Sequence, residues 1–277
     1  MQYDVTAKSF RFRGRSLQLV PGMPLLMGIA NATPDSFSDG GEFADVAACV
    51  SHSLSMISEG ASIIDVGGES TRPGHTPVDA ETELSRVIPV VRALRGASDI
   101  PISVDTSKAV VAREALLAGA DIVNDVSGGS SEMYAVLKEF GAGCVLMDGH
   151  KLEPHADVLA EVRASLLALR DKAIAASGLS CEHFLLDPGV GFGKDAAQNL
   201  CCVRHAAEFT DGRSGVLLGV SRKSFIGTVA DEPIPLKRLP GTLACGIIGR
   251  HCAVLRVHDV AAHKQALTIA NAILGPN

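Results

Sequence analysis

Polar residues follow several short apolar runs of this sequence, at the points where the runs end. They are Asn31, Asp65, Asp105, Asn124, Asp187, Lys223, Arg256 and His258. A carboxylate accepts two parallel N–H bonds from an amidine-like edge, and an amide both donates and accepts hydrogen bonds. Asp105, Asn124 and Asp187 together therefore indicate a pocket for a planar heterocycle with such an edge.

The basic and amide residues of this set indicate a site for an anion. Arg256, His258 and Asn31, with the N-terminus of a helix that opens near Asp259, would meet a diphosphate. The net charge of -6 provides no broad basic surface, so a phosphate group has to be met by a local cluster of this kind. Asn31 also offers an oxygen to Mg²⁺, which tends to take its other ligands from phosphate and water.

Each of these residues also has a simpler explanation. A single Asp or Asn in the set is equally well explained as the cap of the next helix. His258, taken alone, is better explained as a structural histidine. Capping explains neither Lys223 nor Arg256, however, so the set as a whole favours a functional site.

Eight apolar, β-branched runs carry these residues at their ends, and helical patterns separate the runs. The runs cover residues 25–30, 62–66, 101–104, 121–123, 143–147, 183–186, 215–220 and 252–257. Strand followed by helix, eight times over, predicts a (β/α)8 TIM barrel, in which all strand ends surround one mouth. Residues 9–19, alternating around Arg13-Gly14, predict a β-hairpin that plugs the bottom of the barrel. A doubly wound open sheet is the rival fold, but no G-x-G-x-x-G follows the first run.

Composition limits the class of protein. A chain of 277 residues that is 47% hydrophobic suits one barrel domain over residues 1–277. Seven cysteines without a Cys-x-x-Cys pair argue against a disulfide framework and a zinc site, and favour the reducing cytoplasm. With no tryptophan, two tyrosines and no long apolar run, the sequence predicts neither a nucleic-acid partner nor a membrane segment.

Seven segments around these residues resemble the dihydropteroate synthases, a family of pterin-binding enzymes. They are residues 27–41 (MGIANATPDSFSDGG), 64–74 (IDVGGESTRPG), 102–108 (ISVDTSK), 122–126 (IVNDV), 186–194 (LDPGVGFGK), 221–224 (SRKS) and 256–259 (RVHD). The resemblance extends over roughly residues 25–274, with the segments in order.

The resemblance implies a reaction and a role for each matched residue. Dihydropterin-CH2-diphosphate would release its diphosphate, and the aniline nitrogen of 4-aminobenzoate would take its place, giving 7,8-dihydropteroate for folate biosynthesis. Asp105, Asp187, Lys223 and Asn31 would be catalytic. The implied contacts are Asp105, Asn124, Asp187, Lys223, Met147, Gly191 and Phe192 for the pterin; Asn31, Arg72, Arg256 and His258 for diphosphate; Thr71, Pro73, Ser224 and Phe37 for 4-aminobenzoate; and Asn31 for Mg²⁺. The family also implies a homodimer formed through the last helices, including residues 250–262.

The residue types agree with early departure of the diphosphate. A methylene beside a conjugated pterin can carry positive charge, so an SN1-like reaction needs no protein nucleophile. Asp105 and Asp187 would favour that charge. The long loops 31–43 and 67–78 follow strand ends and are expected to act as lids that exclude water.

One segment departs from the family pattern. After the run 143–147 the family has Met-His-Met followed by Gly and Pro, whereas this chain has Met147-Asp148-Gly149-His150-Lys151. Met147 can still face the pterin ring. Asp148 adds a possible negative charge beside the pocket.

Three alternatives stay open on the sequence. A pterin-binding barrel that moves a methyl group from methyltetrahydrofolate to a corrinoid could share the acids and the amide. Lys223 could form a Schiff base in an aldolase. A non-catalytic paralogue that only binds pterin would account for the altered Asp148 loop.

Overall fold

The computed structural model describes residues 8–32, 42–69 and 77–275 of the chain. Eight parallel strands close into a barrel in which each strand pairs with the next along the chain and the last pairs with the first. The strands are β3 (Leu25–Asn31), β4 (Ile63–Gly67), β5 (Ile102–Asp105), β6 (Ile122–Asp125), β7 (Gly143–Met147), β8 (Phe184–Asp187), β9 (Gly215–Gly219) and β10 (Val254–Val257). The predicted TIM barrel is confirmed.

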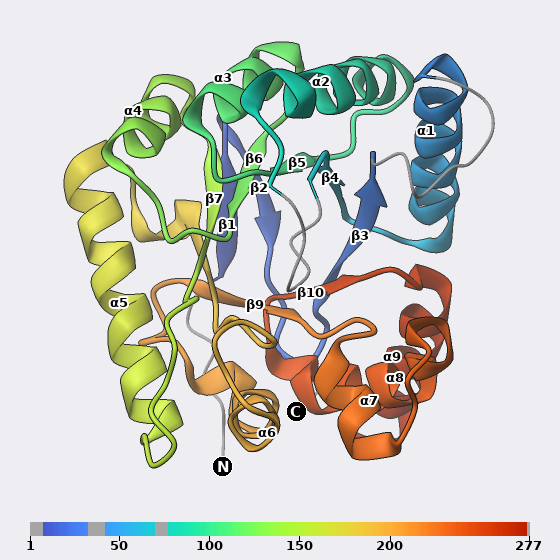
Figure 1. Cartoon of the computed structure of the whole chain (residues 1–277), viewed down its shortest axis with the longest axis vertical. Helices are drawn as coiled ribbons and strands as arrows, with labels where there is room; N and C mark the ends of the chain where they lie inside the picture. Colours follow the sequence, from blue (N-terminus) through green and yellow to red (C-terminus); the bar gives the residue numbers. More distant parts are fainter. Residues whose placement is uncertain (1–7, 33–41, 70–76, 276–277) are drawn as a thin grey trace.

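Helices follow the strands and form a ring around them (Figure 1). They are α1 (Glu42–Glu59), α2 (Ala80–Ala97), α3 (Ala109–Ala118), α4 (Ser131–Phe140), α5 (Val158–Ser177), α6 (Ala196–Arg204), α7 (Ser224–Ala230), α8 (Leu239–Ile248) and α9 (Val260–Leu274). Asp79 and Asp157 accept backbone N–H bonds at the starts of α2 and α5, and Gly119 and Gly141 end α3 and α4 with a positive φ. Capping therefore defines where several of the helices begin or end.

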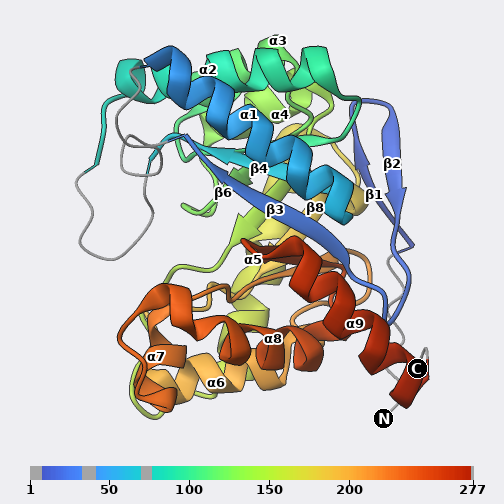
Figure 2. The same ribbon diagram turned by 90° about the vertical axis from the view of Figure 1, so that its right-hand side faces the viewer.

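An antiparallel hairpin closes the amino-terminal end of the barrel, as predicted. It consists of β1 (Ser9–Phe12) and β2 (Arg15–Gln18), joined at Arg13 and Gly14, which both have a positive φ. Phe10 and Phe12 are fully or almost fully buried among the inward side chains of the strands. Figure 2 shows the hairpin beside the barrel, at the end from which β3 starts.

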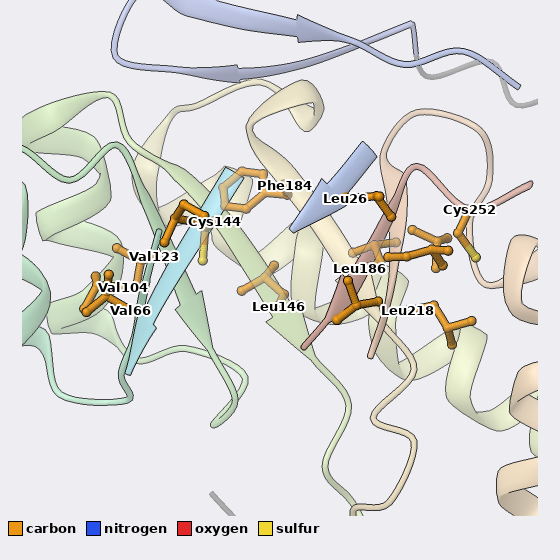
Figure 3. Packing of buried hydrophobic residues seen from close by; sticks show 14 of the residues in the cluster. Leu26, Val66, Val104, Val123, Cys144, Leu146, Phe184, Leu186, Leu218 and Cys252 are labelled. Atoms are coloured by element: carbon orange, nitrogen blue, oxygen red, sulfur yellow. The ribbon is translucent and has the colours of Figure 1, made fainter. Parts of the chain in front are cut away.

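The side chains of each strand alternate between the inside of the barrel and the surrounding helices. Outward residues such as Val66, Val104 and Val123 pack beneath the helices, where Figure 3 shows them close together. Inward residues form a separate apolar cluster: Met27, Ile63, Ile122, Val145, Leu185, Leu217 and Val254, with Phe10 and Phe12. Because the period of a strand is two, the next inward position on each strand lies one pleat nearer the mouth.

None of the described helices is long and apolar enough to span a bilayer. All seven cysteines are free thiols, and Cys49, Cys144, Cys202 and Cys252 are buried.

Candidate active site

The inward positions nearest the mouth carry the polar residues of the sequence motifs. Two residues beyond the apolar cluster lie Asp65 on β4, Asn124 on β6, Met147 on β7, Asp187 on β8 and Arg256 on β10, and Asp105 follows Ser103 on β5. The strand register sets Asp105 beside Asn124 and Met147 beside Asp187. The sequence prediction that Asp105, Asn124 and Asp187 converge at one mouth is consistent with this register.

Arg256 crosses the barrel to two buried acids. Its Nε donates to Asp65 Oδ2 at 2.6 Å and its Nη2 donates to Asp105 Oδ2 at 2.7 Å. Asn124 Nδ2 donates to the same Asp65 oxygen at 3.1 Å. Burial and the two neighbouring carboxylates act in opposite directions, and the net result is a raised pKa for Arg256. The guanidinium therefore stays charged and links three strands.

Two carboxylate oxygens in this cluster lack a protein partner. Asp65 Oδ1 and Asp105 Oδ1 are buried, and neither forms a hydrogen bond with any described residue. Burial raises the pKa of Asp105 to about 7, although the charge of Arg256 opposes the shift. Unpartnered buried acceptors cost stability unless a ligand supplies the donor. These oxygens therefore suit the N–H groups of a heterocycle.

Asp187 and Lys223 form the second charged part of the mouth. Asp187 Oδ1 accepts the backbone N–H of Gly189 at 2.7 Å, and burial raises its pKa against the opposing charge of Lys223. Lys223 Nζ donates to the carbonyl of Val190 and lies 4.6 Å from the ring centroid of Phe192. Burial lowers the pKa of Lys223 to about 8. The pKa of Lys223 therefore lies close to neutral pH, and its ammonium lies beside the Phe192 ring.

His258 is held beside the mouth by Ser221. The Ser221 hydroxyl lies 2.9 Å from His258 Nδ1 and accepts the backbone N–H of His258 at 3.2 Å. Arg222, which has a φ of 58°, bonds Asp259 at 2.6 and 3.1 Å and so ties the loop after β9 to the loop after β10. His258 contacts Ser221, whereas Arg256 contacts Asp65 and Asp105. The two basic residues of the predicted anion site come from one strand end but point to different partners.

Asn31 ends β3 and is half-buried at the mouth. Its side-chain amide carries one oxygen, which is a type of ligand that hard cations accept. The described chain contains no group of three or more His, Cys, Asp or Glu side chains that could hold a metal ion. A single amide oxygen fits an ion such as Mg²⁺ that keeps mostly phosphate and water ligands, and it does not fit a protein cage.

The remaining predicted site residues are partly buried, partly exposed and partly outside the described residues. Met147 is buried beside Asp187, and Gly191, with a φ of 85°, lies against Lys223. Ser224 is exposed at the first position of α7. Phe37, Thr71, Arg72 and Pro73, and most of both expected lid loops, lie outside the described residues.

The unusual Asp148 is almost completely buried and has charged partners. Lys194 Nζ, whose side chain is also buried, lies 3.0 Å from Asp148 Oδ2. Ser165 donates to Asp148 Oδ1 at 2.7 Å, and His150 Nδ1 contacts the same oxygen. The extra acid therefore does not leave an uncompensated charge beside the pocket.

Sequence reasoning gave no role to two residues of this region. Asp65 was recognised only as a strand-end residue, although its two-residue spacing from Ile63 was enough to direct it inward. Lys194 lies in a recognised segment, but its pairing with Asp148 spans 46 residues and leaves no pattern in the sequence.

A parallel barrel with acids, an amide and a lysine at its mouth defines a class of barrels that bind small molecules. Comparison with known proteins identifies the family. Residues 27–258 match the model of a protein family that is described as "Pterin binding enzyme". The dihydropteroate synthase of Synechocystis sp. is 44% identical over 90% of this chain and 89% of its own length. That of Bacillus subtilis is 41% identical over 90% of this chain and 88% of its own.

Solved structures agree with the sequence relatives. A Xanthomonas albilineans dihydropteroate synthase with 4-aminobenzoic acid has a TM-score of 0.88 and 40% identity, covering 97% of this chain and 99% of that one. A Burkholderia cenocepacia dihydropteroate synthase complexed with 7,8-dihydropteroate has a TM-score of 0.85 and 36% identity, covering 96% of each chain. The chain belongs to the pterin-binding enzymes and, within them, to the dihydropteroate synthase family. This membership argues against the methyltransferase and aldolase alternatives.

Proposed function

We propose that this chain joins 6-hydroxymethyl-7,8-dihydropterin diphosphate to 4-aminobenzoate, with 7,8-dihydropteroate and diphosphate as products, in folate biosynthesis. The observation that carries the proposal is the pair of buried, unpartnered oxygens on Asp65 and Asp105 beside Asn124. The two related enzymes solved with 4-aminobenzoic acid and with 7,8-dihydropteroate support the same substrates.

The pterin ring would bind between the two acidic parts of the mouth. Asp105 and Asp187 would accept N–H bonds from the ring, and Asn124 would both donate and accept. Lys223 would donate to a ring acceptor. Met147, Gly191 and Phe192 would supply the apolar walls, because Met147 is inward on β7 and the other two lie against Lys223.

The reaction exchanges one bond to the pterin methylene for another. The C–O bond to diphosphate breaks and the diphosphate keeps the electron pair. The aniline nitrogen forms the new C–N bond, and its lost proton passes to diphosphate or solvent. Asp105 and Asp187 would stabilise the positive charge that develops on the pterin as the leaving group departs. Since this charge is carried by the substrate, the protein needs no nucleophile.

The leaving diphosphate would be bound by Asn31, Arg72, Arg256 and His258. Bound Mg²⁺ would neutralise charge on the diphosphate, and Asn31 would hold it through its amide oxygen. Arg256 would contribute to both the pterin pocket and the diphosphate site. Its guanidinium already links Asp65 and Asp105 beside the pterin pocket. It would thereby couple pterin binding to retention of the anion.

The second substrate would enter from the side of α7. Ser224, which directly follows Lys223, would contact 4-aminobenzoate together with Phe37, Thr71 and Pro73. A Yersinia pestis dihydropteroate synthase, 36% identical to this chain, has been solved in complex with a sulfonamide drug. We therefore expect sulfonamides to compete with 4-aminobenzoate here.

The activity is tested by supplying dihydropterin-CH2-diphosphate and Mg²⁺ and measuring diphosphate release. Release should depend on 4-aminobenzoate and should fall when Mg²⁺ is chelated. Pterin binding without turnover would instead identify a non-catalytic paralogue. Trapping of a carbonyl substrate on Lys223 by borohydride would identify an aldolase.

We also propose that the chain forms a homodimer through α8 and α9. An apolar groove runs along these helices, and its lining includes Leu243, Ile247, Ala266, Ile269 and Ile273. Ile273 is 76% exposed and Ile269 is 56% exposed. The small residues Ala262, Ala266 and Ala270 repeat every four positions on α9, which lets a symmetry-related helix approach closely. The free cysteines support a reducing cytoplasm as the site of the reaction.

A further inference from the structure

The Asp148–Lys194 ion pair lies buried between the loops that follow β7 and β8. The side chains of Asp148 and Lys194 are 1% and 0% exposed. Lys194 Nζ contacts Asp148 Oδ2 at 3.0 Å, the Asp148 carbonyl at 3.1 Å and the Phe192 carbonyl at 3.4 Å. All of these partners belong to the two loops, so the ammonium fastens one loop to the other.

Asp148 is committed to this junction. Its Oδ1 accepts from Ser165 of α5 and contacts His150, while its Oδ2 faces Lys194. Its backbone N–H donates to the Asp187 carbonyl at 2.9 Å. The carboxylate therefore faces the loops and α5 and is not a further acceptor for the heterocycle.

The two loops pack backbone against backbone. A Cβ on Gly189 would lie 1.8 Å from the Asp148 carbonyl oxygen, and one on Gly193 would lie 2.7 Å from the His150 carbonyl oxygen. Leu152 donates its N–H to Gly193 at 3.3 Å. There is no room for a side chain between the loops, so displacement of one loop is transmitted to the other.

The loop after β8 also forms the surface on which Lys223 rests. Val190 accepts the Lys223 ammonium, and the Phe192 ring lies 4.6 Å from Nζ. A Cβ on Gly191 would lie 2.9 Å from Lys223 Cδ. The position of residues 189–194 therefore determines where Lys223 lies beside Asp187.

We infer that Asp148 and Lys194 are positioning residues for the pterin pocket, whose ion pair holds the loop 189–194 where it supports Lys223. The inference rests on the proposed function, because it assigns Lys223 to the pterin. Removing one partner would leave the other buried without its counter-charge, whereas removing both charges would leave the packing largely intact.

The test compares Asp148→Asn, Lys194→Met and the double variant, with binding of 6-hydroxymethyl-7,8-dihydropterin measured by calorimetry. Each single variant should bind the pterin about tenfold more weakly, and the double variant should return to within about threefold of the wild type. A purely structural pair would lower the unfolding temperature without changing the affinity of the folded fraction. Unchanged pterin affinity in both single variants would overturn the inference.

Arg170→Met provides a matched control. It breaks another ion pair of a buried cation, between Arg170 Nη1 and Asp211 Oδ1 at 2.6 Å, although the Asp211 side chain is 24% exposed. Asp211 lies before β9, at the opposite end of the barrel. This variant should lose stability and keep its pterin affinity. If Asp148→Asn does not fold, Ser165→Ala removes a single bond to Asp148 and should weaken pterin binding by a smaller factor; no change would count against the inference.

The outcomes separate this inference from the proposed function. A wild-type chain that binds the pterin but releases no diphosphate would defeat the proposed reaction, while the affinities of the variants would still decide the role of the pair. A wild-type chain that does not bind the pterin would overturn both.

Discussion

The two ends of the barrel are built from the same strands but have opposite chemistry. At the amino end, Phe10 and Phe12 of the hairpin fill the interior against residues such as Ile63 and Leu185. Two residues further along the same strands, roughly 7 Å away, the inward positions are Asp65 and Asp187. Both levels are buried, so the difference lies in polarity and not in exposure.

Because of this difference, the amino end contributes mainly to stability and the mouth is suited to binding a ligand. The apolar end gains free energy from burial, whereas the mouth contains buried carboxylate oxygens without protein partners, which cost free energy. A change at the amino end should therefore affect stability alone. A change at the mouth should affect binding and turnover, and removing an unpartnered carboxylate there should raise stability at pH values where that carboxylate is ionised.

The largest effect is expected at the closed end. Phe12→Ala should lower the free energy of unfolding by about 3–5 kcal/mol, because it opens a cavity under the barrel. Urea titration would measure the loss, and pterin affinity should stay unchanged in the fraction that remains folded. A large change in that affinity would show that the two ends are coupled.

The pH dependence of stability should reveal the cost of Asp105. Its pKa is about 7 in the folded chain and 3.8 without the fold, so the folded state holds a proton that the unfolded state has released between these values. The contribution of Asp105 to the free energy of unfolding should therefore be greatest below about pH 4. It should fall as the pH rises from about 4 to about 7.

Comparison with Asp105→Asn isolates this contribution. The wild-type chain should lose on the order of a few kcal/mol relative to the variant over this pH range. Arg256, Asp65, Glu83 and Asp125 also act on Asp105, and all of them are retained in the variant. Parallel pH profiles for the two proteins would show that Asp105 is not the group responsible.

At the open end, Asp187→Asn and Lys223→Ala should each reduce turnover at least about tenfold, which corresponds to about 1.4 kcal/mol of transition-state stabilisation. Diphosphate release would be measured under saturating substrates. The unfolding temperature should change little, in contrast to Phe12→Ala. Turnover equal to that of the wild type would remove these residues from the proposed site.

The smallest effect on the site is expected from the outer surface. Ile273→Glu places a charge on the exposed apolar face of α9 and should shift a dimer toward monomers in analytical ultracentrifugation. Turnover per chain should change by less than about twofold, because the described mouth lies on the inner faces of the strands. An unchanged sedimentation coefficient would argue against dimerisation through this face.

The sequence allowed accurate prediction where local spacing determines geometry. Short apolar runs predicted the eight strands, and the ends of these runs placed Asp105, Asn124 and Asp187 at or next to the ends of β5, β6 and β8. The same alternation was sufficient to direct Asp65 inward. The α6 helix also had a local signal, since Asp195 and Gln198 form a capping box.

The remaining features depend on how distant loops meet. The contact of Arg256 with Asp65 spans 191 residues, and it requires the closed barrel to bring β10 next to β3, one strand away from β4. The Lys194–Asp148 pair depends on the packing of two glycine-bearing loops, which no periodic pattern records. These contacts depend on closure of the barrel and on the packing of its loops, so the spacing of residues in the sequence could not predict them.

The hairpin has a consequence for the order in which the chain is assembled. Arg13 Nη1 donates to the carbonyls of Leu116 and Ala120, and Ser9 donates to Glu182, 173 residues later. During synthesis, the hairpin precedes all of these partners. Phe10 and Phe12 therefore lack their native contacts until most of the barrel strands have been synthesised. The hairpin is synthesised early but is one of the last segments to pack in its native position.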